Sequence, residues 1–205
     1  MDPKQFNRTG WDAWANADGR WSVPVDEDVI ARARKGDWDV LLTPSKTVPR
    51  EWFGDIAGKD LLGLASGGGQ QCPTFAAAGA RVTCLDASDE QLQRDRDVAA
   101  REGLELRTVQ GYMDDLCAFN DASFDLIFHP CSNCFAPEIL PVWKECARVL
   151  RPGGALLSGF TNPIVYVFDV LALERGEVIA RHKLPMSEFD LPEKEREEIM
   201  AADDS

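Results

Sequence analysis

Short apolar runs alternate with longer helical stretches along the chain from Lys59 onward. The apolar runs predict five strands, at residues 60–65, 81–86, 105–110, 124–129 and 155–160. The intervening stretches predict helices at 71–78, 89–102 and 137–150, the last with its apolar residues on one face at helical spacing. Strands that alternate with helices indicate a parallel sheet with helices on both faces. The predicted fold is therefore α/β, Rossmann-like and doubly wound.

The helix at 89–102 is nearly all polar and should lie on the outside of the molecule. Its apolar anchors are few: Leu92, Val98 and Ala99. The Pro152-Gly153-Gly154 sequence predicts a sharp turn just before the fifth strand.

The two ends of the chain differ from this alternating region. Residues 1–50 are rich in tryptophan and proline, lack strand alternation and predict a helical or irregular cap with one helix at 26–35. The tryptophans are expected to pack onto a neighbouring surface; the alternative is that one or two line a substrate pocket. Residues 51–186 form the expected main domain, and residues 187–205 an acidic segment that carries eight acidic and two basic side chains.

Only 45 residues follow the fifth strand, and they offer one weak strand, at 177–183. Either the chain is a piece of a longer protein, or its sheet lacks the last one or two strands. A short sheet would leave an exposed edge, which favours pairing with a second copy in a homodimer.

Charge and composition argue against two classes of partner, nucleic acids and membranes. The net charge is −13, and no basic stripe with interleaved aromatic residues is present, which argues against a nucleic-acid partner. No segment approaches the roughly 20 apolar residues of a membrane span, and the amino terminus has no apolar signal core, so no membrane partner and a cytoplasmic location are expected. Six cysteines without an export signal are expected to be reduced thiols.

The first predicted strand ends at Ala65, and the sequence Ser66-Gly67-Gly68-Gly69 follows it directly. Consecutive glycines let the backbone pass close to a ligand because no Cβ intervenes. The second strand ends in Asp86, 17 residues after Gly69, near the spacing of about 20 expected for an acid that binds ribose hydroxyls. The alternative for Asp86 alone is a helix N-cap, a role that Ser88 can fill itself. Together the two features predict a nucleotide-cofactor site.

Four motifs identify a family resemblance: residues 62–70 (LGLASGGGQ), 82–88 (VTCLDAS), 123–129 (SFDLIFH) and 145–154 (ECARVLRPGG). In this order they resemble class I S-adenosylmethionine-dependent methyltransferases over about residues 58–160. The resemblance implies S-adenosylmethionine as cofactor and a small-molecule methyl acceptor. A nicotinamide-dependent oxidoreductase would explain the glycine loop and Asp86 but not the Arg-Pro-Gly-Gly segment.

The resemblance also implies roles for particular residues. It places Ala65, Ser66, Gly67 and Gly69 around the methionine part of the cofactor and Asp86 on the ribose. It places Ala87 and Ser88 near the adenine, with Tyr112, Met113 and Asp114 bordering the ring. His129 and Pro130 would lie close to the sulfonium and the methyl acceptor. His129 is the candidate catalytic base, the alternative being a strand-end histidine bonded to a backbone group.

Three positions depart from the family pattern. Gly63 stands where the family usually has an acid, Ala65 replaces the first loop glycine, and Tyr112 replaces the acid that bonds the adenine amine. Asp114 or a backbone carbonyl is the expected substitute for the last. Each lost hydrogen bond costs about 0.5–1.5 kcal/mol, so a non-catalytic cofactor-binding or interaction protein on the same fold is the second hypothesis.

The cysteines suggest a further possibility. Cys131 and Cys134 form a Cys-x-x-Cys directly after the fourth strand, and Cys72 opens the helix after the glycine loop. These three thiols could converge on the pocket mouth and bind a soft metal or arsenite. Buried free cysteine is common in cores, however, and no second pair has zinc-finger spacing. No metal is therefore predicted, and Cys84 and Cys146 are expected in the core.

Overall fold

The computed structural model of the protein describes residues 2–43, 46–184 and 191–196. The chain divides into two units, Met1–Phe160 and Thr161–Ser205, and each is described by itself.

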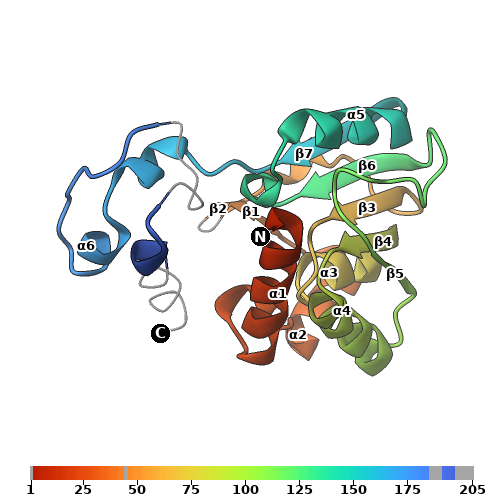
Figure 1. The fold of residues 1–205 in the computed structure, drawn as a ribbon. Coiled ribbons are helices and arrows are strands. Elements are labelled where there is room, and N and C mark those ends of the chain that lie inside the picture. Colours follow the sequence, from red (N-terminus) through yellow and green to blue (C-terminus); the bar gives the residue numbers. More distant parts are fainter. Residues whose placement is uncertain (1, 44–45, 185–190, 197–205) are drawn as a thin grey trace. The chain divides into compact units, whose positions relative to one another are not determined.

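The first unit is built on a five-stranded parallel sheet in the order β5-β4-β3-β6-β7 (Figure 1). Its strands are β3 (Asp60–Leu64), β4 (Arg81–Asp86), β5 (Leu106–Gln110), β6 (Phe124–His129) and β7 (Leu150–Ser158). The chain winds outward from β3 through β4 to β5 and then returns to the other side of β3 as β6 and β7. The order reverses between β3 and β6, and the crevice at the carboxyl ends of such strands is where open α/β sheets bind ligands. The predicted doubly wound sheet is confirmed.

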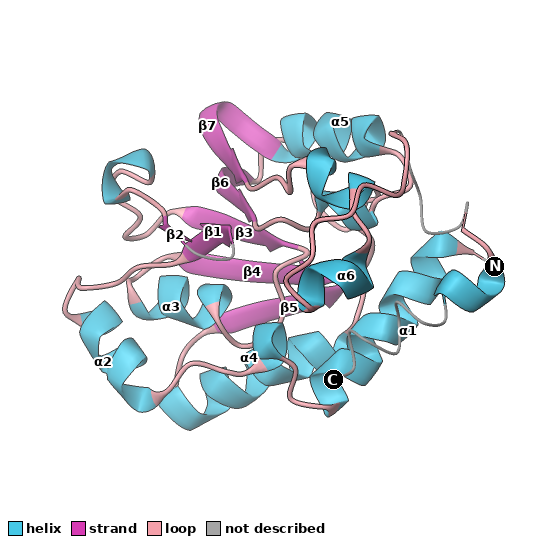
Figure 2. Ribbon diagram, turned by 90° about the vertical axis from the view of Figure 1, so that its left-hand side faces the viewer, coloured by secondary structure: helices cyan, strands magenta, loops and turns pink. Residues whose placement is uncertain are grey.

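Helices cover both faces of the sheet, as predicted. Figure 2 shows α2 (Glu27–Arg34), α3 (Gln71–Ala77) and α4 (Asp89–Glu102) on one side and α5 (Ile139–Val149) on the other. The first face buries a cluster that includes Leu61, Phe75 and Phe128. The opposite face buries a second cluster that includes Leu62, Ile127 and Val142. Because adjacent strand residues point to opposite faces, Leu61 and Leu62 belong to different cores.

Helix α4 has the bounds predicted from the sequence. The Ser88 hydroxyl caps its first turn by accepting the Gln91 N–H at 3.1 Å, and Gly103 ends it with a φ of +63°. The three apolar anchors are buried. Two polar side chains of the helix, Gln91 and Asp95, are also buried, which the prediction of an outer polar helix did not anticipate.

The amino-terminal region contains more regular structure than predicted. It begins with α1 (Pro3–Asn16), which Asp2 caps, and it includes a short antiparallel pair, β1 (Leu41–Thr43) and β2 (Lys46–Thr47). The expectation that this region has no strands is therefore wrong. Its alternation was not visible because the two strands have three and two residues. Trp38 packs edge-on against Phe75 at 5.7 Å between ring centroids, so this tryptophan serves packing. Two 3₁₀ turns, Arg20–Ser22 and Arg50–Trp52, complete the region.

Strand β7 begins earlier than the sequence suggested. Phe124 pairs with Leu150 and Leu126 with Ala155, so the register shifts between the two pairs. The predicted turn at Pro152–Gly154 is therefore wrong: these residues form a bulge inside the strand, with Gly153 at a φ of +83°.

The second unit contains a 3₁₀ helix at Pro163–Val167 and α6 (Val170–Glu174). The strand predicted at 177–183 is wrong, because that segment forms only a single antiparallel bridge, between Phe168 and Ala180. Its apolar residues are exposed, Val178 at 75%, and so provide no buried face to hold a ladder. Most of the acidic segment at 187–205 lies outside the described residues. No helix in the described ranges has the length and apolar character needed to cross a membrane.

Candidate cofactor site

The glycine loop leaves the end of β3 through backbone conformations that favour glycine. Ala65 has a φ of +48° and donates its N–H to the Leu85 carbonyl at 2.7 Å, which ties the strand end to β4. Gly68 has a φ of +116°, and a Cβ there would lie 2.4 Å from the Trp21 carbonyl oxygen. Gly69, at +74°, accepts the Val25 N–H at 2.9 Å. The amino-terminal region therefore packs directly against the loop.

Asp86 joins the end of β4 to this loop. One carboxylate oxygen accepts the Gly67 N–H and the other the Ser88 N–H, both at 3.0 Å. Burial raises the pKa of Asp86, while these backbone N–H groups oppose the rise. Ser88 is the N-cap of α4, so Asp86 is not needed as a cap. A carboxylate has about four lone-pair positions, and two remain for further donors such as ribose hydroxyls.

The end of β5 places the next predicted residues beside helix α1. Lys4 forms an ion pair with Asp114 at 2.6 Å, and its ammonium lies 5.1 Å from the centre of the Tyr112 ring. Met113 packs partly buried against the core that holds α5. The Ala87 carbonyl accepts a hydrogen bond from Gln110 at 3.1 Å.

Helix α1 contributes contacts that the sequence analysis missed. Asp12 accepts a hydrogen bond from the Ser88 hydroxyl at 2.6 Å, and the Trp11 carbonyl accepts one from Gln91 at 3.3 Å. Together with Lys4, these contacts place α1 along the ends of β4 and β5. No motif in residues 1–16 signals this position, because the partners lie 76 and more residues away in the chain.

At the end of β6, His129 is fully buried. Its Nδ1 lies 2.8 Å from the Leu64 carbonyl oxygen, so the ring donates from Nδ1, and Nε2 has no hydrogen-bond partner among the described residues. Burial lowers the pKa of His129, which favours the neutral imidazole. The bond to a backbone carbonyl is the alternative expected for a strand-end histidine, and it leaves Nε2 as a bare acceptor.

The loop after β6 is tied back to the glycine loop. The Ser132 hydroxyl lies 2.7 Å from the Ala65 carbonyl oxygen and 2.5 Å from that of Pro130. A 3₁₀ turn at Asn133–Phe135 follows, in which Asn133 donates to the Gly159 carbonyl at the end of β7. The carboxyl ends of β3, β6 and β7 thus meet at one place.

Beneath the glycine loop lies a buried polar group that the sequence analysis missed. Asp95 of α4 accepts the Gly68 N–H at 3.1 Å and a hydrogen bond from the Cys84 thiol at 3.7 Å. Burial, together with the nearby charge of Asp86, raises the pKa of Asp95 well above its usual value. The spacing was a usable signal, since Asp95 lies three residues after Leu92 and four before Ala99, on the apolar face.

Cys72 is not at the pocket mouth. It is fully buried, with its sulfur 3.8 Å from the Ser66 hydroxyl. The atom lies where a side chain at Gly63 would start, since a Cβ built there would be 2.2 Å from the sulfur. The suggested convergence of Cys72 with Cys131 and Cys134 is therefore wrong: Cys72 points into the core, and Cys134 is exposed.

The remaining buried thiols match the expectation. Cys84 and Cys146 lie in the core, and hydrogen bonding to Cys72 together with burial raises the pKa of Cys84. Burial raises the pKa of Cys146 to about 12.

Comparisons with known proteins agree with this geometry. Residues 62–158 match the family model described as a methyltransferase domain. The uncharacterized methyltransferase YbaJ of Bacillus subtilis is 50% identical over 187 residues, which are 91% of this chain and 73% of that protein. A ubiquinone biosynthesis O-methyltransferase of Vibrio parahaemolyticus is 30% identical over 124 residues, covering 58% of this chain and 52% of the relative. The chain thus spans about half the length of that enzyme.

A solved structure shows the same fold. YcgJ of Bacillus subtilis matches with a TM-score of 0.50 and 21% identity, covering 75% of this chain and 64% of that one. S-adenosylmethionine is the cofactor of this family. The Asp86 carboxylate, with acceptor positions left beside the glycine turn, is chemically suited to such a nucleotide cofactor. The chain belongs to the class I S-adenosylmethionine-dependent methyltransferases.

Proposed function

We propose that the protein transfers the methyl group of S-adenosylmethionine to a small-molecule acceptor, which is held at the carboxyl ends of β3, β6 and β7. The observation that carries this proposal is the contact between Asp86 and the Gly67 N–H, because it holds the ribose-binding acid against the glycine loop. When bound, the cofactor supplies an electrophilic methyl group, and the protein supplies proximity and alignment.

The residues proposed to hold the cofactor come from the glycine loop and from the segments at the carboxyl ends of β4, β5 and β6. The loop residues face the methionine part, Asp86 the ribose, and the ends of β4 and β5 the adenine. The full set is Ala65, Ser66, Gly67, Gly69, Asp86, Ala87, Ser88, Tyr112, Met113, Asp114, His129 and Pro130. Asp114 is paired with Lys4. Its carboxylate would therefore accept a hydrogen bond from the adenine amine while it also contacts the Lys4 ammonium.

Aromatic rings support the acceptor side of the proposal. Trp143 lies edge-on to His129, with 5.9 Å between ring centroids, and Phe160 lies at the same distance from Trp143. Phe160 is 61% exposed although it follows the end of β7, and Phe135 packs edge-on against Trp11 at 5.3 Å. Rings that remain open to a ligand favour an acceptor with an apolar body.

In this proposal His129 is the base, because its Nε2 has a lone pair and no partner in the described structure. An acceptor that must lose a proton would transfer it to this nitrogen. Since the ring is fully buried, this role requires the neighbouring side chains to move when the acceptor binds.

Calorimetry with S-adenosylhomocysteine, the demethylated cofactor, tests the cofactor site. Asp86→Asn removes a charge that would accept two ribose hydroxyls, each worth about 1.5–3 kcal/mol, so affinity should fall at least 100-fold. The matched control is Asp97→Asn, which changes an exposed carboxylate of α4 that accepts a hydrogen bond from Gln93. Equal affinity of the two variants would contradict the assignment of Asp86.

The same titrations separate the competing functions. Binding of NADH without binding of S-adenosylmethionine would contradict the proposal. Binding of S-adenosylhomocysteine without turnover on a broad panel of phenols, amines and carboxylates would favour the non-catalytic alternative.

We also propose that the protein has no nucleic-acid partner, is located in the cytoplasm and forms a homodimer. A net charge of −13 argues against a nucleic-acid partner and is compatible with a cytoplasmic enzyme. In the described part of the sheet, β5 and β7 are the outer strands, and either edge would allow pairing with a second copy. Light scattering coupled to size exclusion tests the homodimer.

A further inference from the structure

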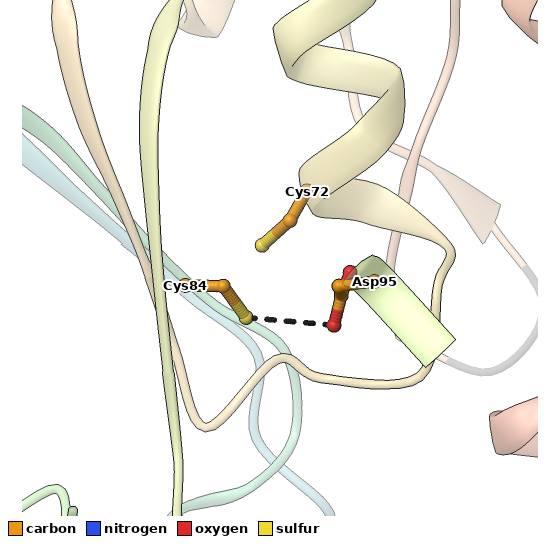
Figure 3. A group of neighbouring side chains, drawn as sticks. All are labelled: Cys72, Cys84 and Asp95. Carbon is orange, nitrogen blue, oxygen red and sulfur yellow. Dashed lines mark hydrogen bonds between the residues drawn. The ribbon is translucent and has the colours of Figure 1, made fainter. Parts of the chain in front are cut away.

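Three potential metal ligands meet in the core beneath the glycine loop. Cys72 lies in the first turn of α3, Cys84 lies in β4 and Asp95 projects from α4 (Figure 3). One atom of each, two sulfurs and one oxygen, lies within 4.8 Å of the others. All three side chains are fully buried. Three different elements therefore direct soft and hard donor atoms to a single point.

The hydrogen bonds within this group leave it incomplete. Asp95 Oδ2 accepts the Gly68 N–H and the Cys84 thiol, whereas Oδ1 has no hydrogen-bond partner among the described residues. The Gly69 N–H also faces this carboxyl and lowers its pKa, which does not offset the rise caused by burial. Asp95 forms no ion pair within the described ranges, and the negative charge of Asp86 raises its pKa further. A fully buried carboxylate oxygen without a donor is costly, because nothing replaces the water that it loses on folding.

We infer that Cys72, Cys84 and Asp95 bind a thiophilic divalent cation, with Zn²⁺ as the ion that fits them best. Two thiolates and one carboxylate are ordinary zinc ligands, whereas Ca²⁺ and Mg²⁺ prefer sites made only of oxygen. In tetrahedral zinc coordination two sulfurs lie about 3.8 Å apart. Because the ligand atoms already lie within 4.8 Å of one another, they need to approach by at most about 1 Å. On binding, both thiols release their protons to solvent and the sulfurs bond to the metal.

The cation would also act on the cofactor loop. Asp95 Oδ2 holds the Gly68 N–H, so a cation that fixes this carboxylate also fixes the turn of the loop. Gly63 is part of the same arrangement, since only a residue without a side chain leaves room for the Cys72 sulfur. The proposed metal site therefore lies beside Gly63, the position where the family usually has an acid.

The first test loads the reduced, chelator-treated protein with Co²⁺, a spectroscopic substitute for zinc. Thiolate ligation produces a sulfur-to-cobalt charge-transfer band in the near ultraviolet, and added Zn²⁺ should displace it. After zinc loading and gel filtration, mass spectrometry should find about one zinc per chain. Zinc should also raise the Tm by about 5 °C or more at concentrations 100-fold above its Kd.

Substitutions test which residues bind the metal. Cys84→Ser and Asp95→Asn should each lower zinc affinity at least tenfold and weaken or shift the cobalt band. The control variant, Cys131→Ser with Cys134→Ser, removes the thiols of the Cys-x-x-Cys and should retain one equivalent. A second control, Cys146→Ser, changes a buried thiol of the other core.

Two results would overturn the inference. One is a wild-type protein that binds less than about 0.1 equivalent of zinc and shows no charge-transfer band. The other is loss of the metal from the Cys131 and Cys134 variant with full retention by Cys84→Ser and Asp95→Asn. The zinc stoichiometry and the cobalt band of the wild-type protein can overturn the inference even if a core variant fails to fold.

Discussion

Gly63 and Cys72 compete for the same volume, so their substitutions should be strongly coupled. A Cβ at position 63 would lie 2.2 Å from the Cys72 sulfur, far inside van der Waals contact. Both positions are buried between β3 and α3, where the backbone cannot easily retreat. Overpacking of this kind costs about 1–3 kcal/mol, and the short distance places Gly63→Ala at about 2–3 kcal/mol.

The reverse change should relieve the conflict. Cys72→Ala alone removes a buried sulfur and should cost about 1–2 kcal/mol through the cavity that it leaves. In the double variant the new Cβ fills part of that cavity, so its stability should be no lower than that of Cys72→Ala. The expected coupling between the two substitutions is therefore about 2 kcal/mol in the stabilising direction.

Urea unfolding followed by circular dichroism measures all four proteins. Chelator in every sample removes any contribution from metal. At about 2–4 °C per kcal/mol for a chain of this size, Gly63→Ala should also lower the Tm by about 4–12 °C. The matched control is Gly10→Ala in α1, where a Cβ meets nothing within 4 Å and should not destabilise. Wild-type stability of Gly63→Ala, or additive effects in the double variant, would refute the packing argument.

Three further substitutions test other parts of the structure. Gly68→Ala should cost at least about 2 kcal/mol in urea unfolding, because its φ is +116° and the new Cβ would meet the Trp21 carbonyl; a smaller loss would show that the loop adapts. Arg148→Ala should cost about 1–2 kcal/mol, because the carbonyls of Leu116 and Phe119 lose their donor; an unchanged urea midpoint would show that water replaces it. Burial lowers the pKa of His129, so the wild type should lose stability as the pH falls through about 6.5, the unfolded value. His129→Gln should flatten this dependence between pH 7.5 and 5.5, and parallel curves for both proteins would contradict it.

The central strands β3, β4 and β6 were predictable because they are short apolar runs that are mostly buried. Each such run carries its own signal and needs no information about distant partners. The β7 bulge was not predictable in the same way. Pro152 and Gly153 are typical of a turn, and only the pairing of Phe124 and Leu126 with a neighbouring strand reveals that the chain continues in the sheet.

In the candidate site, too, residues marked by a local pattern were predictable, and residues placed by contacts distant in the sequence were not. Asp86 could be proposed from the sequence because its position after Gly69 is a local spacing, and the structure places it against the glycine loop. The roles of Lys4 and Asp12 depend on contacts across 110 and 76 residues, which no local pattern encodes. Asp95 was overlooked for a different reason: a charged residue on an apolar helix face was interpreted as part of a solvated surface, although its spacing from Leu92 pointed inward.

The contacts of α1 lead to a prediction about the effect of ionic strength on cofactor exchange. The ammonium of Lys4 lies 34% exposed in its ion pair with Asp114, so salt can screen it. The Asp12 bond to Ser88 joins the same helix to the end of β4. If the adenine end of the cofactor enters between these elements, dissociation should become faster as salt rises, while the buried glycine loop is unaffected. The amino-terminal helix would then set the residence time of the cofactor.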